Sequence, residues 1–384
     1  MPSLVSHVTA TYGPELPAAV ERAVAPFGGW PALVQPGERI CVKVNLLRAA
    51  APEKVVCTNP ETLRLVLQGL KAAGAVPFVA DSPGGRGTHR SVAHAYKLSG
   101  MQDVCDAEQV EIVYADDDVV ELPATDGRLF RGFPVGRCFT EADGMVQVGP
   151  LKTHGLMRLT AGVKLTFGCV AGLRKAQLHV RASERRHFAD MLLDLHLAVA
   201  PRFTIIDGIV AMQGKGPGNG TPRALGSLFA AADCCALDAA VADRTAHDRT
   251  AIYTLAAAER RGLIDLADPY ELTGDPFTPD HGFEQATRDA QDRVPKFLLR
   301  YGRNVLTSRP RLVDDPACTR CGECRDICGV GAITLDPTPV YDDRRCVRCY
   351  ACTEICPTAA IQEVSPLLLR LTGGAKRPSQ TPAA

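Results

Sequence analysis

Short apolar runs alternate with longer stretches of helical periodicity along the first 310 residues of the chain. The short runs predict buried strands at Arg39–Val44, Val76–Ala80, Val110–Tyr114, Met145–Val148, Phe203–Ile206 and Ser227–Ala231. Apolar residues that recur every three or four positions predict helices at Pro60–Ala73, Glu184–Val199, Cys234–Arg244 and Ala251–Arg261. This alternation is typical of an α/β body whose mixed or parallel sheet is flanked by helices.

Polar residues follow two of the predicted strands at the ends where ligands of open α/β sheets bind. Lys43 and Asn45 alternate at the end of the first strand, so they point toward the same or neighbouring space. Asp81 follows the second strand and begins a turn-rich stretch. These three residues are candidates for binding a substrate or a cofactor.

A dense group of cationic and imidazole side chains follows the strand predicted at Met145–Val148. Its catalytic candidates are Lys152, His154, Lys164, Lys175 and His179, joined by Asp207 after the next strand. Such a group is suited to binding an anionic organic substrate or cofactor, and a histidine among lysines is suited to proton donation with a lowered pKa. A solvated polar face is the alternative. We interpret His187 and His196, in an amphipathic helical pattern, as surface or structural residues.

A glycine-rich loop lies between the last two predicted strands. Its candidate anion- or substrate-binding residues are Gly214, Lys215, Gly216, Gly218 and Gly220. Small residues so close together allow backbone N–H groups to converge on an anion. The loop lacks the G-x-x-x-x-G-K-[ST] order of a P-loop and the G-x-G-x-x-G dinucleotide pattern. A surface turn that needs positive φ is the alternative.

The charge balance of the 384-residue chain excludes partners that depend on a strong overall field. Lys plus Arg and Asp plus Glu number 43 each, so we expect neither nucleic acid nor an anionic membrane surface as a partner. No apolar run approaches the ~20 residues that span a bilayer, so membrane insertion is not expected. Met1–Pro14 lacks the features of a signal peptide, which predicts a cytoplasmic protein. The sequence leaves the oligomeric state open.

Two copies of one cysteine spacing lie near the C-terminus. They are Cys318-x2-Cys321-x2-Cys324-x3-Cys328 and Cys346-x2-Cys349-x2-Cys352-x3-Cys356. The copies share further residues at the same offset, because Arg320 recurs as Arg348 and Ile327 as Ile355. We interpret the two copies as a duplicated unit.

This part of the chain resembles the bacterial two-cluster ferredoxin module, a small α+β domain. In that arrangement the last cysteine of each run ligates the other cluster. The resemblance therefore implies one 4Fe-4S cluster on Cys318, Cys321, Cys324 and Cys356, and a second on Cys346, Cys349, Cys352 and Cys328. Gly329 stands where the first run would normally have proline, whereas Pro357 is present in the second, so equal potentials are not expected.

Zinc and disulfides are the alternatives for these cysteines. Structural zinc usually takes separated pairs of ligands, and disulfides need an oxidising compartment. Both therefore fit two uninterrupted runs less well than iron–sulfur clusters do. We interpret the remaining cysteines as buried small side chains: Cys41, Cys57, Cys105, Cys138, Cys169, Cys234 and Cys235.

The order of several motifs resembles the family known as domain of unknown function 362. The motifs are Val42–Asn45, Asp81–Gly84, Lys152–His154, Thr160–Gly172, Asp207–Gly208, Gly214–Gly220 and Asp233–Asp238. The resemblance implies an α/β body joined to an electron-transfer module in an anaerobic or microaerobic cytoplasm. We place the α/β domain at residues 1–310, the ferredoxin-like domain at 311–365 and a disordered tail at 366–384.

Two hypotheses about function follow. The favoured one is an oxygen-sensitive iron–sulfur oxidoreductase, a reductase that passes electrons from a redox partner protein through two 4Fe-4S clusters to a small anionic substrate in the body. The alternative is a non-catalytic electron carrier or adaptor that docks to a redox partner. No flavin or nicotinamide motif is recognisable.

Overall fold

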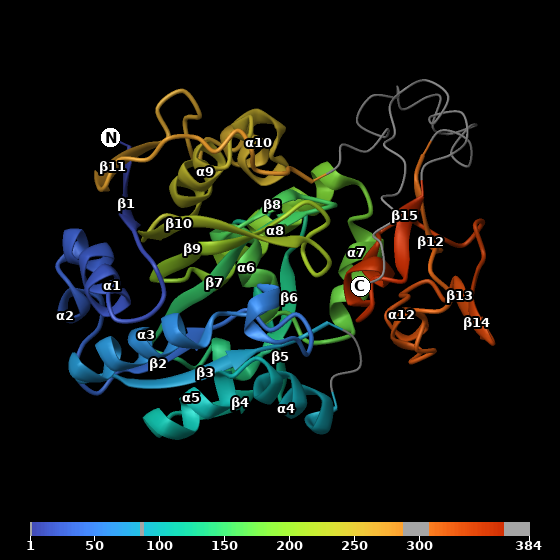
Figure 1. Cartoon of the computed structure of the whole chain (residues 1–384), viewed down its shortest axis with the longest axis horizontal. Coiled ribbons are helices and arrows are strands. Elements are labelled where there is room, and N and C mark those ends of the chain that lie inside the picture. Colours follow the sequence, from blue (N-terminus) through green and yellow to red (C-terminus); the bar gives the residue numbers. More distant parts are fainter. Residues whose placement is uncertain (1, 85–87, 287–306, 365–384) are drawn as a thin grey trace. The chain divides into compact units, whose positions relative to one another are not determined.

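The computed structural model describes residues 2–84, 88–286 and 307–364. The chain divides into two compact units, Met1–Ala286 and Thr287–Ala384 (Figure 1). The boundary predicted after residue 310 needs correction, because it cuts strand β12 (Arg309–Leu312), which pairs with β15 (Ile361–Val364) of the second unit. The predicted tail, residues 366–384, lies outside the described residues.

The first unit is built on a nine-stranded sheet in the order β11-β1-β10-β9-β7-β2-β3-β4, with β8 paired to β7. Its strands are β1 (Ser3–Thr9), β2 (Arg39–Lys43), β3 (Val76–Asp81), β4 (Glu111–Tyr114), β7 (Gly144–His154), β8 (Arg158–Thr160), β9 (Phe203–Gln213), β10 (Thr221–Ala231) and β11 (Tyr270–Gly274). The run from β4 to β9 is parallel, and β10 is antiparallel to both of its neighbours. The predicted mixed sheet is confirmed.

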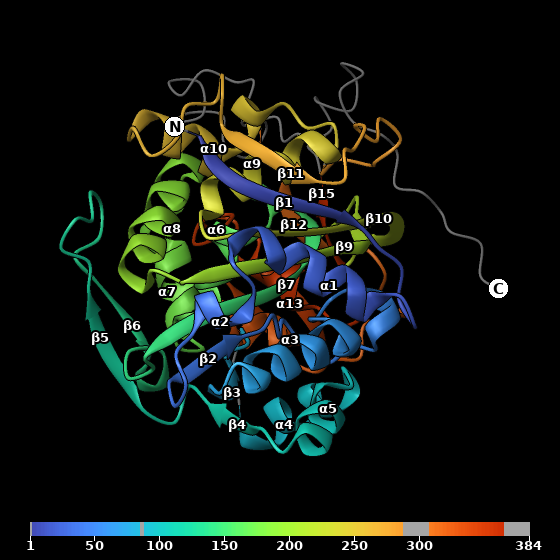
Figure 2. The same cartoon turned by 90° about the vertical axis from the view of Figure 1, so that its left-hand side faces the viewer.

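Helices flank this sheet. They are α1 (Leu16–Val24), α2 (Trp30–Leu33), α3 (Pro60–Ala72), α4 (His89–Leu98), α5 (Met101–Glu108), α6 (Gly162–Leu165), α7 (Arg174–Arg181), α8 (Arg185–Val199), α9 (Cys234–Arg244) and α10 (Tyr253–Arg260). Five short 3-10 turns accompany them: η1 (Ala25–Phe27), η2 (Pro52–Lys54), η3 (Arg137–Phe139), η4 (Thr166–Cys169) and η5 (Arg249–Ala251). The hairpin of β5 (Val119–Pro123) and β6 (Gly132–Gly136) extends away from the main sheet (Figure 2). None of the described helices is long and apolar enough to cross a membrane.

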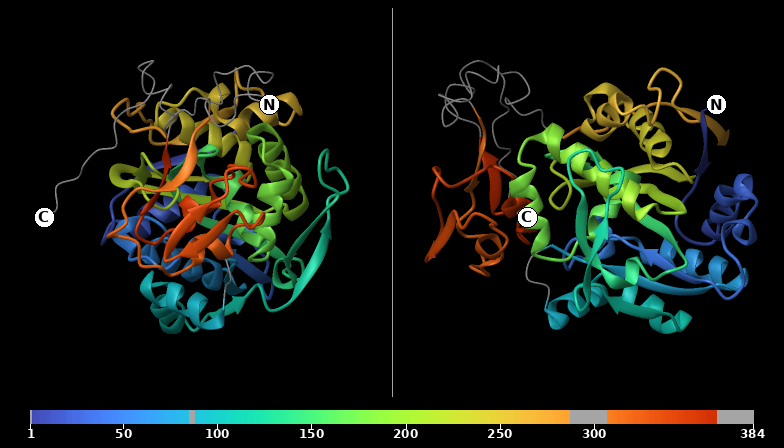
Figure 3. Two further views of the ribbon diagram at one scale, coloured as in Figure 1. Left: turned by 90° about the vertical axis from the view of Figure 1, so that its right-hand side faces the viewer. Right: turned by 180° about the vertical axis from the view of Figure 1, so that it is seen from behind.

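The two faces of the sheet bury different apolar clusters because successive strand residues point to opposite sides. Ile40 and Val42 of β2 belong to a cluster with α1 and α3, whereas Cys41 belongs to a cluster with α8. Figure 3 shows further views of these layers. Of the seven cysteines outside the paired runs, all are buried except Cys138, which is half-buried.

Local sequence signals explain where α3 begins and ends. The Asn59 side chain accepts a hydrogen bond from the Glu61 backbone N–H, and Pro60 occupies the first turn, where its missing N–H costs nothing. Gly74, with φ of +89°, follows the last turn. The predicted span was one residue too long.

Strand β7 is much longer than the sequence predicted. It extends past Val148 to His154, and every residue after Gly144 is buried. Lys152 and His154 interrupt the apolar run, so hydrophobicity alone marks the end of the strand too early. This extension carries the polar residues into the interior.

The second unit contains two similar halves. Helix α12 (Glu323–Asp326) corresponds to α13 (Ala351–Ile355), and β13 (Ile333–Asp336) corresponds to β15. Strand β14 (Thr338–Tyr341) pairs with β13, while β12 pairs with β15, so each half contributes to both small sheets. The duplication predicted from the sequence is therefore matched by the fold.

Candidate functional site

The cysteine loops of the second unit share an unusual backbone conformation. Arg320 and Gly322 of the first loop have positive φ, and so do Arg348 and Tyr350 at the matching positions of the second. Left-handed residues of this kind turn the chain sharply. Each loop can therefore bring its three cysteines toward one centre.

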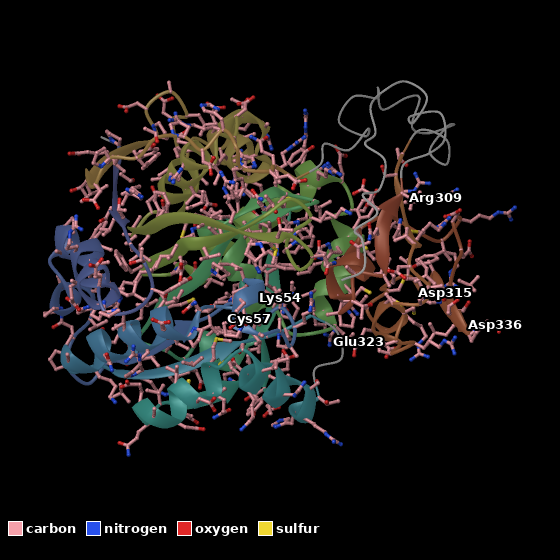
Figure 4. The ribbon with its side chains drawn as sticks, in the orientation of Figure 1. Lys54, Cys57, Arg309, Asp315, Glu323 and Asp336 are labelled. Carbon is pink, nitrogen blue, oxygen red and sulfur yellow. The ribbon has the colours of Figure 1, made fainter. Side chains whose placement is uncertain are left out.

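A single cavity fits the first predicted cluster. Its lining includes Cys318, Cys321, Cys324 and Cys356. The fourth cysteine comes from the other half of the repeat, as the two-cluster arrangement requires. Glu323, which begins α12 beside this cavity, is labelled in Figure 4.

Mutual effects on pKa show that the thiols of each set are close together. Burial raises the pKa of Cys324 to about 11, and the charges of Cys321, Cys356 and Cys318 act in the same direction. Burial likewise raises the pKa of Cys352, with further contributions from the other three cysteines of the second set and from Cys324. Bound metal deprotonates such thiols outright. The donor sets therefore fit the two predicted clusters.

In the first unit, Lys43 and Asp81 form a buried ion pair at the ends of β2 and β3. Lys43 Nζ lies 3.0 Å from Asp81 Oδ1 and donates to the Val44 carbonyl (2.6 Å). Asp81 also accepts hydrogen bonds from the backbone N–H groups of Leu46 and Ser82. These groups satisfy one another, so the pair holds the strand ends together. Their predicted role in binding a ligand stays a prediction.

Lys175 also has a structural role. Its Nζ donates to the Ser82 carbonyl (2.7 Å), the Ser82 hydroxyl (3.0 Å) and the Val170 carbonyl. An ammonium has three N–H donors, so these three acceptors use all of them. Lys175 thus ties α7 to the end of β3, and its catalytic role stays a prediction. Burial lowers its pKa to about 8.

Lys152 differs from these two lysines. Its side chain is 3% exposed, and its Nζ donates to one acceptor, the Val56 carbonyl (2.9 Å). Burial lowers its pKa to about 7, the nearby Cys57 thiol opposes that shift, and Lys164 adds to it. Asn45 Nδ2 donates to the same Val56 carbonyl (2.7 Å), so Asn45 lies beside Lys152. Cys57 is labelled in Figure 4.

His154 follows Lys152 on the same face of β7. Its Nδ1 accepts hydrogen bonds from the backbone N–H of Leu156 (3.1 Å) and of Met157 (3.4 Å). The proton of the neutral ring is therefore on Nε2, which makes His154 a hydrogen-bond donor at that atom. Burial holds its pKa well below the usual range, and the charge of Lys164 acts in the same direction.

Lys164 and His179 complete the cationic group. Half-buried Lys164 lies 4.7 Å from the centroid of the Phe167 ring. His179 stacks on Phe188 with ring centroids 4.4 Å apart. Burial lowers the pKa of His179 to about 3, and among the charges that contribute Lys164 has the largest effect. Four of the predicted catalytic candidates therefore lie together: Lys152, His154, Lys164 and His179.

Asp207 of β9 is opposite Pro150 of β7, two residues before Lys152. It accepts hydrogen bonds from Tyr12 Oη (3.0 Å), Thr62 Oγ1 (2.6 Å) and the Ile209 backbone N–H. Burial raises its pKa. Its contacts join β9 to α3 and to the loop after β1, and its catalytic role stays a prediction. His187 is exposed and His196 is half-buried on α8.

The glycine-rich loop is a closed turn. The N–H of Gly214 donates to the Glu284 carbonyl (2.7 Å), and that of Gly216 donates to Thr153 Oγ1 (3.2 Å). A Cβ at Gly216 would lie 2.0 Å from the Thr153 carbonyl oxygen, so only glycine fits there. The anion-binding prediction is corrected for Gly214 and Gly216, whose N–H groups bind protein acceptors. Of the other loop candidates, Lys215 is exposed, and the Gly218 carbonyl accepts a hydrogen bond from Arg48 (2.6 Å).

Sequence reasoning missed three residues beside the cationic group. Arg158 is the direct cross-strand partner of His154, and Arg185 lies close enough for its charge to lower the pKa of His154. The guanidinium carbons of both arginines lie over the Tyr253 ring, 5.5 and 5.8 Å from its centroid. A tight turn after His154 would have predicted a β-hairpin, and with it Arg158 as the cross-strand neighbour of His154. Arg185 and Tyr253 carried no such signal, because both lie at helix starts far along the chain.

Comparison with known proteins agrees with both parts of the chain. The family model described as domain of unknown function (DUF362) matches residues 40–243, and a 4Fe-4S dicluster domain matches residues 317–360. The thylakoid-associated protein sll1697 of Synechocystis sp. is 35% identical over 267 residues, which cover 67% of this chain and 81% of that protein.

One solved structure also shows a slight likeness. The lactate racemase apoprotein from Thermoanaerobacterium thermosaccharolyticum matches with a TM-score of 0.40 and 12% identity, over 60% of this chain and 54% of that chain. Nothing about the activity of this chain follows from so small a likeness. The family matches, in contrast, confirm the resemblance seen in the sequence: the chain belongs to the family of domain of unknown function 362 and carries a C-terminal 4Fe-4S dicluster domain.

Proposed function

We propose that this protein is an iron–sulfur reductase whose α/β body binds a small anionic organic substrate. The 4Fe-4S dicluster domain indicates an iron–sulfur, electron-transfer role for the chain. The clusters supply electrons one at a time when bound, and a reduced redox partner protein is the source. We infer that the substrate binds at the group formed by Lys152, His154, Lys164 and His179.

The observation that carries this proposal is the concentration of cationic groups at the buried end of β7. Lys152 is almost fully buried, and half-buried Lys164 acts on the pKa values of three neighbouring groups. Lys152 Nζ donates to one protein acceptor, the Val56 carbonyl, so its ammonium form keeps N–H donors for an anion. A protein that only carried electrons would have no need for this arrangement. The site is therefore suited to a carboxylate or to a carbonyl that gains negative charge on reduction.

The pKa values decide which group delivers the proton. A two-electron reduction of a carbonyl consumes two electrons and two protons. His154 and His179 are neutral at pH 7, so neither holds an imidazolium proton to give. Lys152, with a pKa of about 7, is partly protonated there and suited to general acid catalysis. We assign one proton to Lys152 and the second to solvent, with His154 Nε2–H donating a hydrogen bond to the developing oxyanion.

Anaerobic single-turnover measurements test the proposal. Protein with reduced clusters is mixed with a panel of 2-oxo acids and other anionic carbonyl compounds, and cluster oxidation is followed by visible absorbance. Lys152→Met and Lys164→Met should slow substrate-dependent oxidation by about tenfold or more, since each removes a charge-assisted contact. Lys54→Met is the matched control, because Lys54 is an exposed lysine on η2 (Figure 4).

Acetate binding, measured together with cluster oxidation, distinguishes a reductase from an adaptor. If both site variants oxidise as fast as the wild type and bind acetate as tightly, the reductase proposal fails and the body is an adaptor. Electron transfer from the partner to the clusters should be unchanged in every variant, because the cluster cysteines belong to the other unit.

A further inference from the structure

One face of the β13–β14 hairpin is directed at the cysteine sets of the second unit. In an antiparallel pair, directly opposed residues and residues two positions apart share a face. Leu335 is opposite Pro339, and Ile333 is opposite Tyr341, so these four side chains lie on one face of the hairpin. Leu335 and Pro339 line the cavity of the first cysteine set. Tyr341 therefore lies on the face that looks toward the clusters.

The end of the hairpin that carries Tyr341 adjoins the second cysteine set. The backbone N–H of Ala332 donates to Cys328 Sγ (3.2 Å), and the Ala332 carbonyl accepts from the Asp342 N–H (2.8 Å). Cys328 is the residue that the exchanged arrangement assigns to the second cluster. The face that carries Tyr341 thus extends from the cavity of the first set to a ligand of the second.

The hydroxyl of Tyr341 is buried without a protein acceptor. Its Oη has no hydrogen-bond partner within the part of the chain that the structure describes. Such a group is unfavourable in a folded protein unless a bound group satisfies it. Burial raises the pKa of Tyr341, and the charges of Cys352, Cys324 and Cys356 act in the same direction, with Cys352 of the second set contributing most of the three. The hydroxyl therefore keeps its proton and lies near thiols of both sets.

Arg311 packs on the ring that carries this hydroxyl. Its guanidinium carbon lies 5.2 Å from the centroid of the Tyr341 ring, and Arg311 also forms an ion pair with Asp343. A cation held over an aromatic face is attracted to it. The ion pair and the ring contact together restrict the movement of the ring, so the hydroxyl is held among the cysteines.

We propose that Tyr341 sets the potential of the second cluster: its hydroxyl donates a hydrogen bond to a sulfur atom of the cluster held by Cys346, Cys349, Cys352 and Cys328. The cluster gains negative charge on reduction, so a hydrogen bond to its sulfur stabilises the reduced form and raises the reduction potential.

The repeat gives the first cluster no equivalent donor. Tyr341 precedes Cys346 by five residues, and the residue five positions before Cys318 is Val313. The second cluster is then the easier of the two to reduce, and an electron shared by the pair resides there. This role depends on the dicluster domain alone and not on the substrate proposed for the α/β body.

Potentiometric titration of the full-length anaerobic protein, followed by electron paramagnetic resonance, tests this role. Tyr341→Phe removes the hydroxyl and keeps the ring. We expect the reduction step at the higher potential to lose about tenfold in its ratio of reduced to oxidised cluster at a fixed potential, which is about 59 mV for one electron. The step at the lower potential should stay. Val340→Ala is the matched control, because Val340 is 50% exposed on the opposite face of β14 and should leave both steps unchanged.

Pulsed electron–nuclear double resonance reads the hydrogen bond directly. In protein whose clusters are reconstituted and reduced in D2O, the hydroxyl carries a deuteron. The wild type should show a deuteron coupling to the second cluster that Tyr341→Phe lacks, whereas the coupling from the Ala332 amide beside Cys328 should remain in both. A purely structural role for Tyr341 predicts no such loss.

An unchanged higher step in Tyr341→Phe with the full iron content would overturn the proposal, because the hydroxyl would then be bound to water. Movement of the lower step alone would overturn it too, since Tyr341 would then act on the first cluster. Should Tyr341→Phe take up less iron than the wild type, a 3-fluorotyrosine in place of Tyr341 keeps the hydroxyl and makes it a stronger donor. The higher step should then rise, and a step that stays would reject the hydrogen bond.

Discussion

Gly168 occupies a position where the structure has no room for a side chain. A Cβ there would lie 2.1 Å from Asp81 Oδ1 and 2.2 Å from Lys43 Nζ. Both atoms belong to a buried ion pair that cannot move without losing its hydrogen bonds. The glycine and the ion pair therefore form one packed unit at the ends of β2 and β3.

We expect Gly168→Ala to lower the free energy of unfolding by about 2–4 kcal/mol, because it overpacks this unit and separates a buried charge pair. Urea unfolding followed by circular dichroism measures the change. Gly155→Ala is the matched control, since its nearest neighbour is 3.9 Å away and its φ is not positive. Equal stabilities for the two variants would contradict the packing argument.

The pH dependence of anion binding should follow Lys152. Burial lowers its pKa to about 7, so its ammonium form predominates below pH 7 and is lost as the pH rises through that value. Cys57, Lys164, Asp81 and Lys43 are the other charged or titratable groups that act on it. Acetate affinity measured from pH 6 to pH 8.5 should fall with rising pH. In Lys152→Gln the affinity should be low and nearly independent of pH, and a profile as steep as that of the wild type would exclude Lys152.

Residue type alone did not distinguish binding groups from structural ones. Lys43, Lys152 and Lys175 all lie near strand ends, yet two of them are satisfied by protein acceptors. The sequence predicted all three as candidate site residues, and all three side chains are buried. Whether a lysine has N–H donors left for a ligand depends on how many acceptors come from segments remote in sequence. Ser82 supplies such acceptors to Lys175, and Val56 supplies one to Lys152.

At the scale of elements, the second unit exchanges strands between its halves. β12 pairs with β15 and β13 pairs with β14, so Cys356 is delivered to the loop that carries Cys318 and Cys321. The sequence repeat was clear, and the resemblance to a two-cluster ferredoxin implied this crossing. The cavity lined by all four cysteines supports it for the first set.

Cys356→Ser should therefore impair the cluster of the first run and spare that of the second. Iron analysis of anaerobically reconstituted protein should fall from about eight to about four atoms per chain. Electron paramagnetic resonance should lose the coupling between two reduced clusters. Cys138→Ser, a half-buried cysteine of the first unit, should keep the full iron content. Loss of the second cluster instead of the first would contradict the exchanged ligand set.

The β7–β8 hairpin shows what element prediction missed. Apolar pattern identified the strand at Met145–Val148, but the strand continues to His154 and returns as β8. A pattern search ends strands at polar residues, whereas here the polar residues are buried. Their cross-strand partner Arg158 remained unidentified for the same reason.

At the scale of the whole molecule, the chain divides into two compact units. The three buried apolar clusters of the first unit draw only on residues up to Phe283. We expect air oxidation to bleach the clusters of the second unit, whose cysteines include the exposed Cys321. Loss of the clusters should lower the stability of the second unit and spare the first.

Differential scanning calorimetry before and after aeration measures this separation. Two transitions are expected for the anaerobic protein, and only the one assigned to the second unit should shift or disappear. The larger transition should keep its midpoint within about 2 °C, a small change for a domain of this size. A single transition that shifts as a whole would show that the units unfold together.

The sequence by itself determined the class of the body, the order of six strands and four helices of the first unit, the duplicated cysteine module and the family. These features depend on local periodicity and on spacing within short segments, and both can be recognised in the sequence. Only the tertiary structure decided which cations satisfy one another, which remain together at the end of β7, and that Arg158, Arg185 and Tyr253 adjoin them. Those outcomes depend on contacts between residues far apart in sequence, and a site built from such contacts exists only once the chain has folded.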